Sequence, residues 1–351
     1  MSTDGKQATA WRRATWWTGL FSLLGVIGVL GTSVRLPILV LEPGPAPDVA
    51  QRTRIEAPTF DSEGSIHLTT ALVDDPKGAT AKEVVEAMMK PDQILYPREA
   101  IYPSDASEEH TQSVQAAQMT QSELEAAVAA LSELGMAYQP EGAFVADVVQ
   151  TSPAAKKLRA GDVITAVDGR PVVVLKDLTS VVDNKAPGDP VRLEVLREGR
   201  RRSFSVAAVE PPSREFSRLG AELVQYNKPP VEVSISSTDI GGPSAGLMYA
   251  LSIYDRLVED DLTGGRKIAG TGTIENTGEQ NGVVGAVGSI GLKVKAADRI
   301  GAAVFVVPKA EVEEAREAAG PEMEVIGVST LHEAIAELKK LTPNKVAQNK
   351  S

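Results

Sequence analysis

The sequence predicts an α/β (α+β) protein with a small domain of short strands between two longer regions of mixed strands and helices, behind a single N-terminal transmembrane helix. Three patterns predict this class: an uncharged apolar run near the start, strand and helix signals in most of the remainder, and short strands separated by glycine turns over residues 142–210. With 351 residues, of which 42% are apolar, the chain is long enough for two or three domains with cores of their own.

The N-terminal residues are predicted to anchor the chain in the cell membrane. Residues 1–14 carry basic side chains and are expected to form a cytoplasmic tail, and residues 15–41 are expected to form the anchor. The apolar run reaches roughly the ~20 residues that a membrane-spanning helix needs. The remainder is therefore expected outside the cytoplasm. A cleaved signal peptide is the alternative, but residues 31–34 fit a small-x-small cleavage site poorly.

The segments that follow the anchor are predicted to lead into the catalytic region. Residues 42–54 are rich in proline and are expected to form a stiff linker. Residues 55–141 are expected to supply the first strands and helices of the catalytic region. Capping-box patterns at Thr80 and Ser122 predict two helix starts in this range. At the other end of the chain, residues 342–351 are polar and are expected to be a disordered tail.

A candidate nucleophile lies within residues 211–341, which are expected to form the main part of the catalytic domain. The segment Asp239-Ile-Gly-Gly-Pro-Ser-Ala-Gly246 places Ser244 at the start of a helix predicted over residues 245–258. Unpaired N–H groups and the positive end of the helix dipole meet there, so they can stabilise an oxyanion when the hydroxyl attacks a carbonyl. Serine is also a common N-cap residue, so the position alone fits a purely structural role.

The same serine matches the G-x-S-x-G pattern of the α/β-hydrolases through Gly242 and Gly246. In that fold the strand runs directly into the serine, whereas here residues 237–243 are predicted to form a loop. The histidine downstream of the serine, His332, is predicted to face solvent on a late helix. A different base is therefore expected.

Lys293 is the candidate base. It lies at the start of a predicted helix that follows the turn Thr271-Gly-Thr-Ile274. The positive end of the helix dipole and burial both disfavour a charged lysine, and a general base must be neutral. Lys295 is two positions further along the helix and lies nearly on the opposite face, so only one of the two lysines can face Ser244.

The serine and lysine segments together resemble the Ser/Lys catalytic domain of Lon-type peptidases. The resemblance is carried by D-I-G-G-P-S-A-G at residues 239–246, and by T-G-T-I at 271–274 followed by V-G-x-I-x-x-K-x-x-A-A at 287–297. Ser289 departs from it, because the family usually has a second glycine there.

The resemblance implies a Lon-type proteolytic domain with Ser244 as nucleophile and Lys293 as general base. It also implies supporting roles in the catalytic site for Asp239, Gly242 and Thr271. It also implies a homo-oligomer, in the form of a hexameric ring. The chain has no G-x-x-x-x-G-K-[ST] segment, so the ATPase module of full Lon enzymes is not expected, and neither a cofactor nor a metal is expected.

Residues 142–210 resemble a PDZ domain, with short strands, glycine turns and one helix predicted over residues 175–182. The resemblance implies that a peptide adds as a strand between this helix and an edge. That edge is made of Gly142, Ala143, Phe144 and Val145. A packing module without a ligand is the structural alternative.

Net charge and cysteine content exclude several classes of function. A net charge of −11 argues against a nucleic-acid partner, and the absence of cysteine excludes disulfides, thiol catalysis and Cys-ligated zinc. The sequence therefore predicts a membrane-anchored, ATP-independent serine endopeptidase whose catalytic and PDZ domains lie outside the cytoplasm and whose partners are peptide or protein substrates. The alternative is a catalytically inert protein that binds or holds peptides through its PDZ domain.

Overall fold

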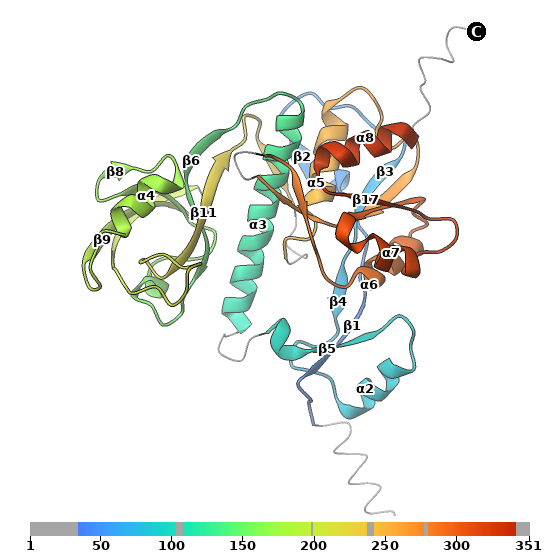
Figure 1. Cartoon of the computed structure of the whole chain (residues 1–351), viewed down its shortest axis with the longest axis horizontal. Coiled ribbons are helices and arrows are strands. Elements are labelled where there is room, and N and C mark those ends of the chain that lie inside the picture. Colours follow the sequence, from blue (N-terminus) through green and yellow to red (C-terminus); the bar gives the residue numbers. More distant parts are fainter. Residues whose placement is uncertain (1–33, 103–107, 198, 237–241, 277–279, 342–351) are drawn as a thin grey trace, which may run out of the picture. The chain divides into compact units, whose positions relative to one another are not determined.

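The computed structural model describes residues 34–102, 108–197, 199–236, 242–276 and 280–341 (Figure 1). The chain divides into two compact units, of which the first comprises Met1–Pro43 with Leu72–Ser104 and the second comprises Gly44–Ala71 with Asp105–Ser351. The second unit contains every candidate catalytic residue that the structure describes.

The first unit is built on a small sheet with strand order β4-β1-β5. Its elements are β1 (Ile38–Pro43), β4 (Ala71–Val73), α2 (Ala81–Met88), β5 (Ile94–Pro97) and a 3-10 turn, η2 (Arg98–Ala100). The predicted helix start at Thr80 is confirmed. The Thr80 hydroxyl accepts the N–H of Glu83, and the Glu83 carboxylate accepts the N–H of Thr80. This reciprocal pair satisfies donors that a helix start otherwise leaves unpaired.

Strand β1 corrects the expectations for the N-terminal region. It occupies the end of the anchor predicted at residues 15–41, and its residues Leu39 to Leu41 are buried in protein. The predicted linker, 42–54, is also folded: it contains the end of β1, the 3-10 turn η1 (Ala50–Arg52) and the start of β2 (Thr53–Ile55). The remainder of the predicted anchor, up to residue 33, lies outside the described residues. No helix in the described part of the chain is long and apolar enough to cross a membrane.

The second unit contains a four-stranded parallel sheet of order β17-β16-β13-β3. Its strands are β3 (Ser65–Leu68), β13 (Lys267–Gly270), β16 (Val304–Pro308) and β17 (Glu324–Val328). Four helices pack against it: α5 (Gly246–Leu257), α6 (Ile290–Arg299), α7 (Val312–Ala318) and α8 (Leu331–Leu341). Because side chains alternate along a strand, Ile268 and Val304 pack with α5 and α8, whereas Ala269 and Phe305 pack with α6 and α7. Helices therefore cover both faces of the sheet.

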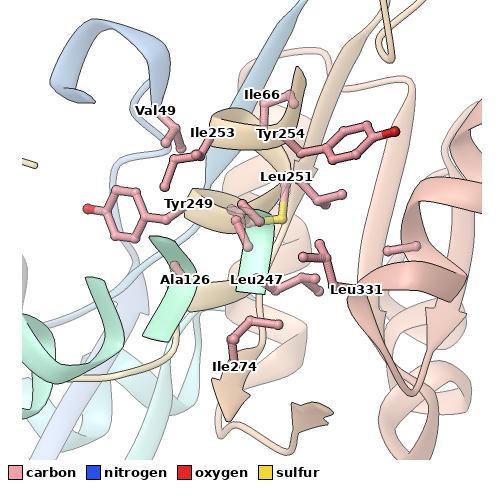
Figure 2. Close-up of a cluster of buried hydrophobic side chains, with 14 of the residues drawn as sticks. Val49, Ile66, Ala126, Leu247, Tyr249, Leu251, Ile253, Tyr254, Ile274 and Leu331 are labelled. Atoms are coloured by element: carbon pink, nitrogen blue, oxygen red, sulfur yellow. The ribbon is translucent and has the colours of Figure 1, made fainter. Parts of the chain in front are cut away.

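Helix α5 lies at the centre of the larger core. Every residue from Gly246 to Asp255 is buried, as expected for a helix that is apolar on most of its circumference. Figure 2 shows its side chains leaving in several directions, with Tyr249 and Leu251 on opposite sides of the helix. The start of α5, where Ser244 lies, is therefore held by packing along the whole helix.

Helix α3 (Glu108–Glu133) begins well before the predicted start at Ser122. Ser122 lies inside the helix, and its hydroxyl donates to the carbonyl of Pro243 at 2.9 Å, so the expectation of a helix start there is wrong. The capping-box pattern predicted that the Ser122 hydroxyl would bond to the backbone of its own helix, but its partner comes from a distant part of the chain. One side of α3 packs on α5, and Ala117 packs with Phe144 of a second sheet.

The second sheet has strand order β10-β9-β7-β6-β11, with all neighbours antiparallel. Its elements are β6 (Gln139–Val148), η3 (Pro153–Lys156), β7 (Val163–Val167), β8 (Arg170–Pro171), α4 (Leu175–Val182), β9 (Pro190–Arg197), β10 (Arg200–Ala207) and β11 (Ala221–Lys228). Strand β11 follows the boundary expected at residue 210, so the sheet takes a strand from beyond the predicted domain. Two further pairs, β2 with β12 (Val233–Ile235) and β14 (Thr273–Glu275) with β15 (Val283–Gly285), complete the unit.

Candidate active site

Ser244 lies immediately before α5 without capping it. The N-cap residue is Ala245, and no side chain provides a cap hydrogen bond. Ser244 is therefore not the N-cap of this helix. The Ser244 carbonyl oxygen accepts hydrogen bonds from the backbone N–H of Gly272 at 2.9 Å and from the Thr271 hydroxyl at 3.0 Å. The serine backbone is therefore held by two donors, while its side chain has no role in starting the helix.

Thr271 follows β13 directly and is fully buried, with 0% of its surface exposed. It lies at the carboxyl end of a parallel strand, where sites in α/β sheets are usually found. Its hydroxyl donates to Ser244 and accepts a hydrogen bond from the Nζ atom of Lys293, at 3.1 Å. Thr271 thus joins the starts of two helices that pack on opposite faces of the sheet.

Lys293 lies in the first half of α6 with only 5% of its surface exposed. Burial lowers the pKa of its ammonium group to about 8, because a charged amine loses hydration there, while the negative charge of Glu311 acts in the opposite direction. A lysine with this pKa is neutral in a substantial fraction of molecules at mildly alkaline pH. Its chemistry is that of a base, provided that a proton donor lies within reach.

The start of α6 departs from ordinary backbone geometry at Ser289. This residue is the N-cap and adopts a left-handed conformation, with φ of 60°. Glycine takes such a conformation without the steric cost that a serine Cβ carries, and glycine is the residue that the Lon-type pattern has there. The Ser289 carbonyl accepts the N–H of Lys293 at 3.2 Å, so the unusual residue still begins the helix.

The other residues of the predicted catalytic site are placed in part. Gly242 has φ of +84°, a conformation that favours glycine, and it lies in the turn before Ser244. Asp239 lies outside the described residues. Within the described part of the chain, no hydrogen bond uses the backbone N–H of Ser244 or Ala245. Both N–H groups directly precede α5, at the positive end of its dipole.

Lys295 and His332 are not part of this cluster. Lys295 is partly exposed on α6, as expected for a position two residues from a buried one. The His332 side chain is 79% exposed on α8, and its Nδ1 atom lies 3.0 Å from the carboxylate of Glu133. The expectation that this histidine faces solvent is confirmed.

A cavity of about 200 Å³ lies beside Pro243, the residue before Ser244. Its walls come from α3, including Ser122 and Glu125, and from β14. Burial raises the pKa of the Glu125 carboxyl to about 7, although the side-chain amide of Asn276 donates to it and opposes this shift. Sequence reasoning assigned neither Ser122 nor Glu125 to the site, because α3 reaches it only through tertiary packing.

The predicted peptide-binding edge is corrected by the pairing of β6. Its residues Gly142, Ala143, Phe144 and Val145 lie inside a strand that has neighbours on both sides. Phe144, for example, pairs with Val163 of β7 and with Val224 of β11. A strand with two neighbours has no free edge for a peptide. Strand β11 ends the order of the sheet, and its Gln225 side chain accepts the N–H of Leu175 at the start of α4, at 2.8 Å.

Comparison with known proteins confirms the PDZ expectation. The PDZ domain family model matches residues 116–208, from within α3 to the end of β10. Among solved structures, the PDZ domain of the SdrC-like protein from Listeria monocytogenes is 25% identical and covers 24% of this chain and 88% of that chain, with a TM-score of 0.23.

The curated relatives are proteins named probable periplasmic serine endoprotease DegP-like. The protein from Pseudomonas fulva is 42% identical over 76 residues, which are 21% of this chain and 16% of the relative. The protein from Pseudomonas savastanoi pv. phaseolicola is 41% identical over 102 residues, which are 25% of this chain and 21% of the relative. The chain thus matches about a fifth of the length of these relatives.

These comparisons correct two further expectations. The relatives are named DegP-like and the matching family model is that of the PDZ domain, so the expectation of a Lon-type proteolytic domain around the PDZ domain is contradicted. The two motifs that implied it cover only short segments around a site, and such segments do not determine a fold. The expected single-pass membrane location is also contradicted, because the relatives are named periplasmic.

Proposed function

We propose that this protein is an ATP-independent serine endopeptidase in which Ser244 attacks a peptide carbonyl and Lys293 accepts the proton of the serine hydroxyl. One observation carries the proposal: the buried Nζ atom of Lys293 is hydrogen-bonded to Thr271, which in turn donates to the carbonyl of Ser244. Two residues from distant parts of the sequence are thereby joined through one buried hydroxyl. The names of the curated relatives agree with this class of reaction.

The proposed reaction has two stages. In the first, the Ser244 Oγ atom bonds to the carbonyl carbon while its proton passes to neutral Lys293. The oxyanion accepts hydrogen bonds from the N–H groups of Ser244 and Ala245. The tetrahedral intermediate then collapses, Lys293 returns the proton to the departing amine, and an acyl-enzyme remains. In the second stage neutral Lys293 takes a proton from water as the water oxygen bonds to the ester carbon. The bond from that carbon to Ser244 Oγ then breaks, and Lys293 returns the proton to Oγ, which restores both residues.

The cavity beside Pro243 is where a side chain of the substrate would lie. Its position next to the nucleophile allows a peptide to present its carbonyl to Ser244 while a neighbouring side chain enters the cavity. The Ser122 hydroxyl holds the Pro243 carbonyl at one wall, so α3 also supports the turn that carries the nucleophile.

The rate of cleavage is expected to rise with pH along a single limb. Below the pKa of Lys293, about 8, the ammonium form predominates and cannot accept a proton; above it the neutral amine predominates, so kcat/KM should increase through this value and then level off. Initial rates of casein cleavage by the full chain, measured over a range of pH, test this.

The control for the pH profile is Glu125→Gln, because the Glu125 carboxyl has a pKa of about 7 and could contribute a limb of its own. This variant should keep the limb of the unmodified protein. A rate that fell with rising pH would contradict the role of Lys293. Absence of cleavage at every pH would favour the alternative, in which the protein binds peptides through its PDZ domain and does not cleave them.

The PDZ domain is proposed to capture substrate peptides along β11 instead of β6. Strand β11 ends the strand order of the sheet, so in the described part of the chain its outer edge has no strand neighbour beyond an isolated bridge between Glu222 and Phe216 at its start. Helix α4 lies beside it, linked through the Gln225 side chain to the N–H of Leu175. A peptide that adds to this edge would gain main-chain hydrogen bonds, and α4 would flank it as in other strand-addition complexes.

Binding of a peptide is expected to slow hydrogen exchange at alternate backbone amides of β11, because only every second amide of an edge strand points outward. Amides of β6 serve as the internal control, since β7 and β11 already flank that strand. Exchange followed by NMR, with and without a casein-derived peptide that the Ser244→Ala variant cannot cleave, is the measurement. New protection confined to β6 would overturn this assignment.

A further inference from the structure

Glu311 is a half-buried carboxylate that the proposed mechanism does not use. It ends the 3-10 turn η4 (Lys309–Glu311), directly before α7. Its Oε1 atom accepts the backbone N–H of Val287 at 2.9 Å, in the segment that leads into α6. Its Oε2 atom is buried and has no hydrogen-bond partner among the described residues. An unsatisfied, buried carboxylate oxygen is costly, so its retention calls for a nearby positive charge.

Lys293 is the cation whose charge acts on the Glu311 carboxylate. Burial raises the pKa of the Glu311 carboxyl, while the ammonium of Lys293 lowers it; reciprocally, the Glu311 carboxylate raises the pKa of Lys293. Lys293 lies in α6, and Glu311 directly precedes α7, which packs against α6. Glu311 therefore acts on Lys293 in two ways: through its contact with the backbone before α6 and through its charge.

We propose that Glu311 is a positioning residue for the base: its carboxylate holds the segment that enters α6 and stabilises the ammonium that Lys293 becomes when it takes the proton of Ser244. This inference rests on the proposed function and extends it. It adds to Ser244 and Lys293 a third group from the loop after β16.

The charge of Glu311 would lower the barrier to proton transfer from Ser244 to Lys293. Lys293 is neutral before it acts and positive once it holds the proton, so an opposite charge stabilises the transition state more than the reactant. The same charge makes the neutral amine scarcer at a given pH, because it raises the pKa of Lys293. Glu311 thus increases the rate on the alkaline plateau and moves the midpoint of the pH profile upward.

The other polar and charged groups near the start of α6 are not expected to act on Lys293 as Glu311 does. Glu314 of α7 is exposed, and its Oε1 atom accepts the N–H of Gly291 at 3.4 Å. It raises the pKa of Glu311 but is not among the charges that shift Lys293. Lys295 lies on α6 itself and is partly exposed. Thr271, which contacts Lys293 from β13, carries no charge.

The decisive variant is Glu311→Gln in the full chain. Glutamine keeps a carbonyl oxygen that can accept the Val287 N–H but removes the charge. We expect the midpoint of kcat/KM against pH to move to lower pH and the alkaline plateau to fall about tenfold. Glu314→Gln is the matched control and should change neither. Glu311→Asp keeps the charge, so its midpoint should stay close to that of the unmodified protein.

A second readout does not depend on activity. The titration of Lys293 can be followed by NMR of its Cε atom in the Ser244→Ala variant, with and without Glu311→Gln. A lower midpoint in the Gln variant supports the inference, and an unchanged midpoint overturns it while leaving the proposed function intact. A lower plateau with no shift in midpoint would make Glu311 a merely structural support and also overturn it. Cleavage by Ser244→Ala at the normal rate would instead refute the proposed function.

Discussion

Replacing Lys293 with arginine is expected to lower kcat/KM for casein by about 10³-fold or more. Arginine keeps the positive charge, but its guanidinium stays protonated at every pH at which the protein is folded, so it cannot accept the serine proton. The buried position of Lys293 leaves little water that could replace the lost base. Initial cleavage rates across the pH range, together with a thermal unfolding curve to show that the variant folds, measure this effect.

Lys295→Arg is the matched control, because it makes the same chemical change on the same helix at a partly exposed position. This variant should cleave at nearly the normal rate. If Lys295→Arg were inactive and Lys293→Arg active, the base would lie two residues later than proposed. Activity in both variants would refute the Ser/Lys mechanism altogether.

Replacing Ser244 with alanine is expected to lower casein cleavage by about 10³-fold or more while changing the free energy of unfolding by only about 0.5 kcal/mol. The reason for the small effect on stability is that the hydroxyl does not cap α5, and its backbone contacts to Gly272 and Thr271 remain. A cleavage assay and a denaturant titration of the same sample separate the two effects.

Two further variants complete this test. Ser252→Ala removes another hydroxyl from α5, at a buried position, and should leave cleavage intact even if stability falls. His332→Ala should be harmless, because the imidazole is exposed and lies against Glu133 on the surface. Loss of cleavage in His332→Ala would support the G-x-S-x-G interpretation, in which a histidine is the base. Full cleavage by Ser244→Ala would contradict both interpretations, because each has Ser244 as the nucleophile.

Several features could be predicted from the sequence because they depend on neighbours along the chain. The helix start at Thr80 is one, since both partners of its capping box lie within one turn. The contrast between buried Lys293 and partly exposed Lys295 is another, because it follows from the period of an α-helix. The PDZ domain was predictable from its turns and short strands, and the family match confirms it.

Other features were beyond local patterns. The capping-box pattern at Ser122 is as good as that at Thr80, yet its hydroxyl serves Pro243, a residue far along the chain. The end of the predicted anchor, residues 38–41, fits a membrane anchor and a buried strand equally well, because composition does not distinguish lipid from a protein core. Long-range packing decided both cases.

The sequence by itself determined that Ser244 and Lys293 stand at the starts of two helices, because glycine, proline and apolar periodicity specify helix starts locally. Only the tertiary structure decided what these starts face. The parallel pairing of β13 places Thr271 between them, and Glu311, at the start of α7, accepts the backbone N–H of Val287 in the segment that leads into α6. Likewise, β6 has no free edge because β11, a strand from beyond the predicted PDZ domain, pairs with it. Such pairings join residues that are distant along the chain, so hydrogen bonding and burial select them only when the whole unit is folded.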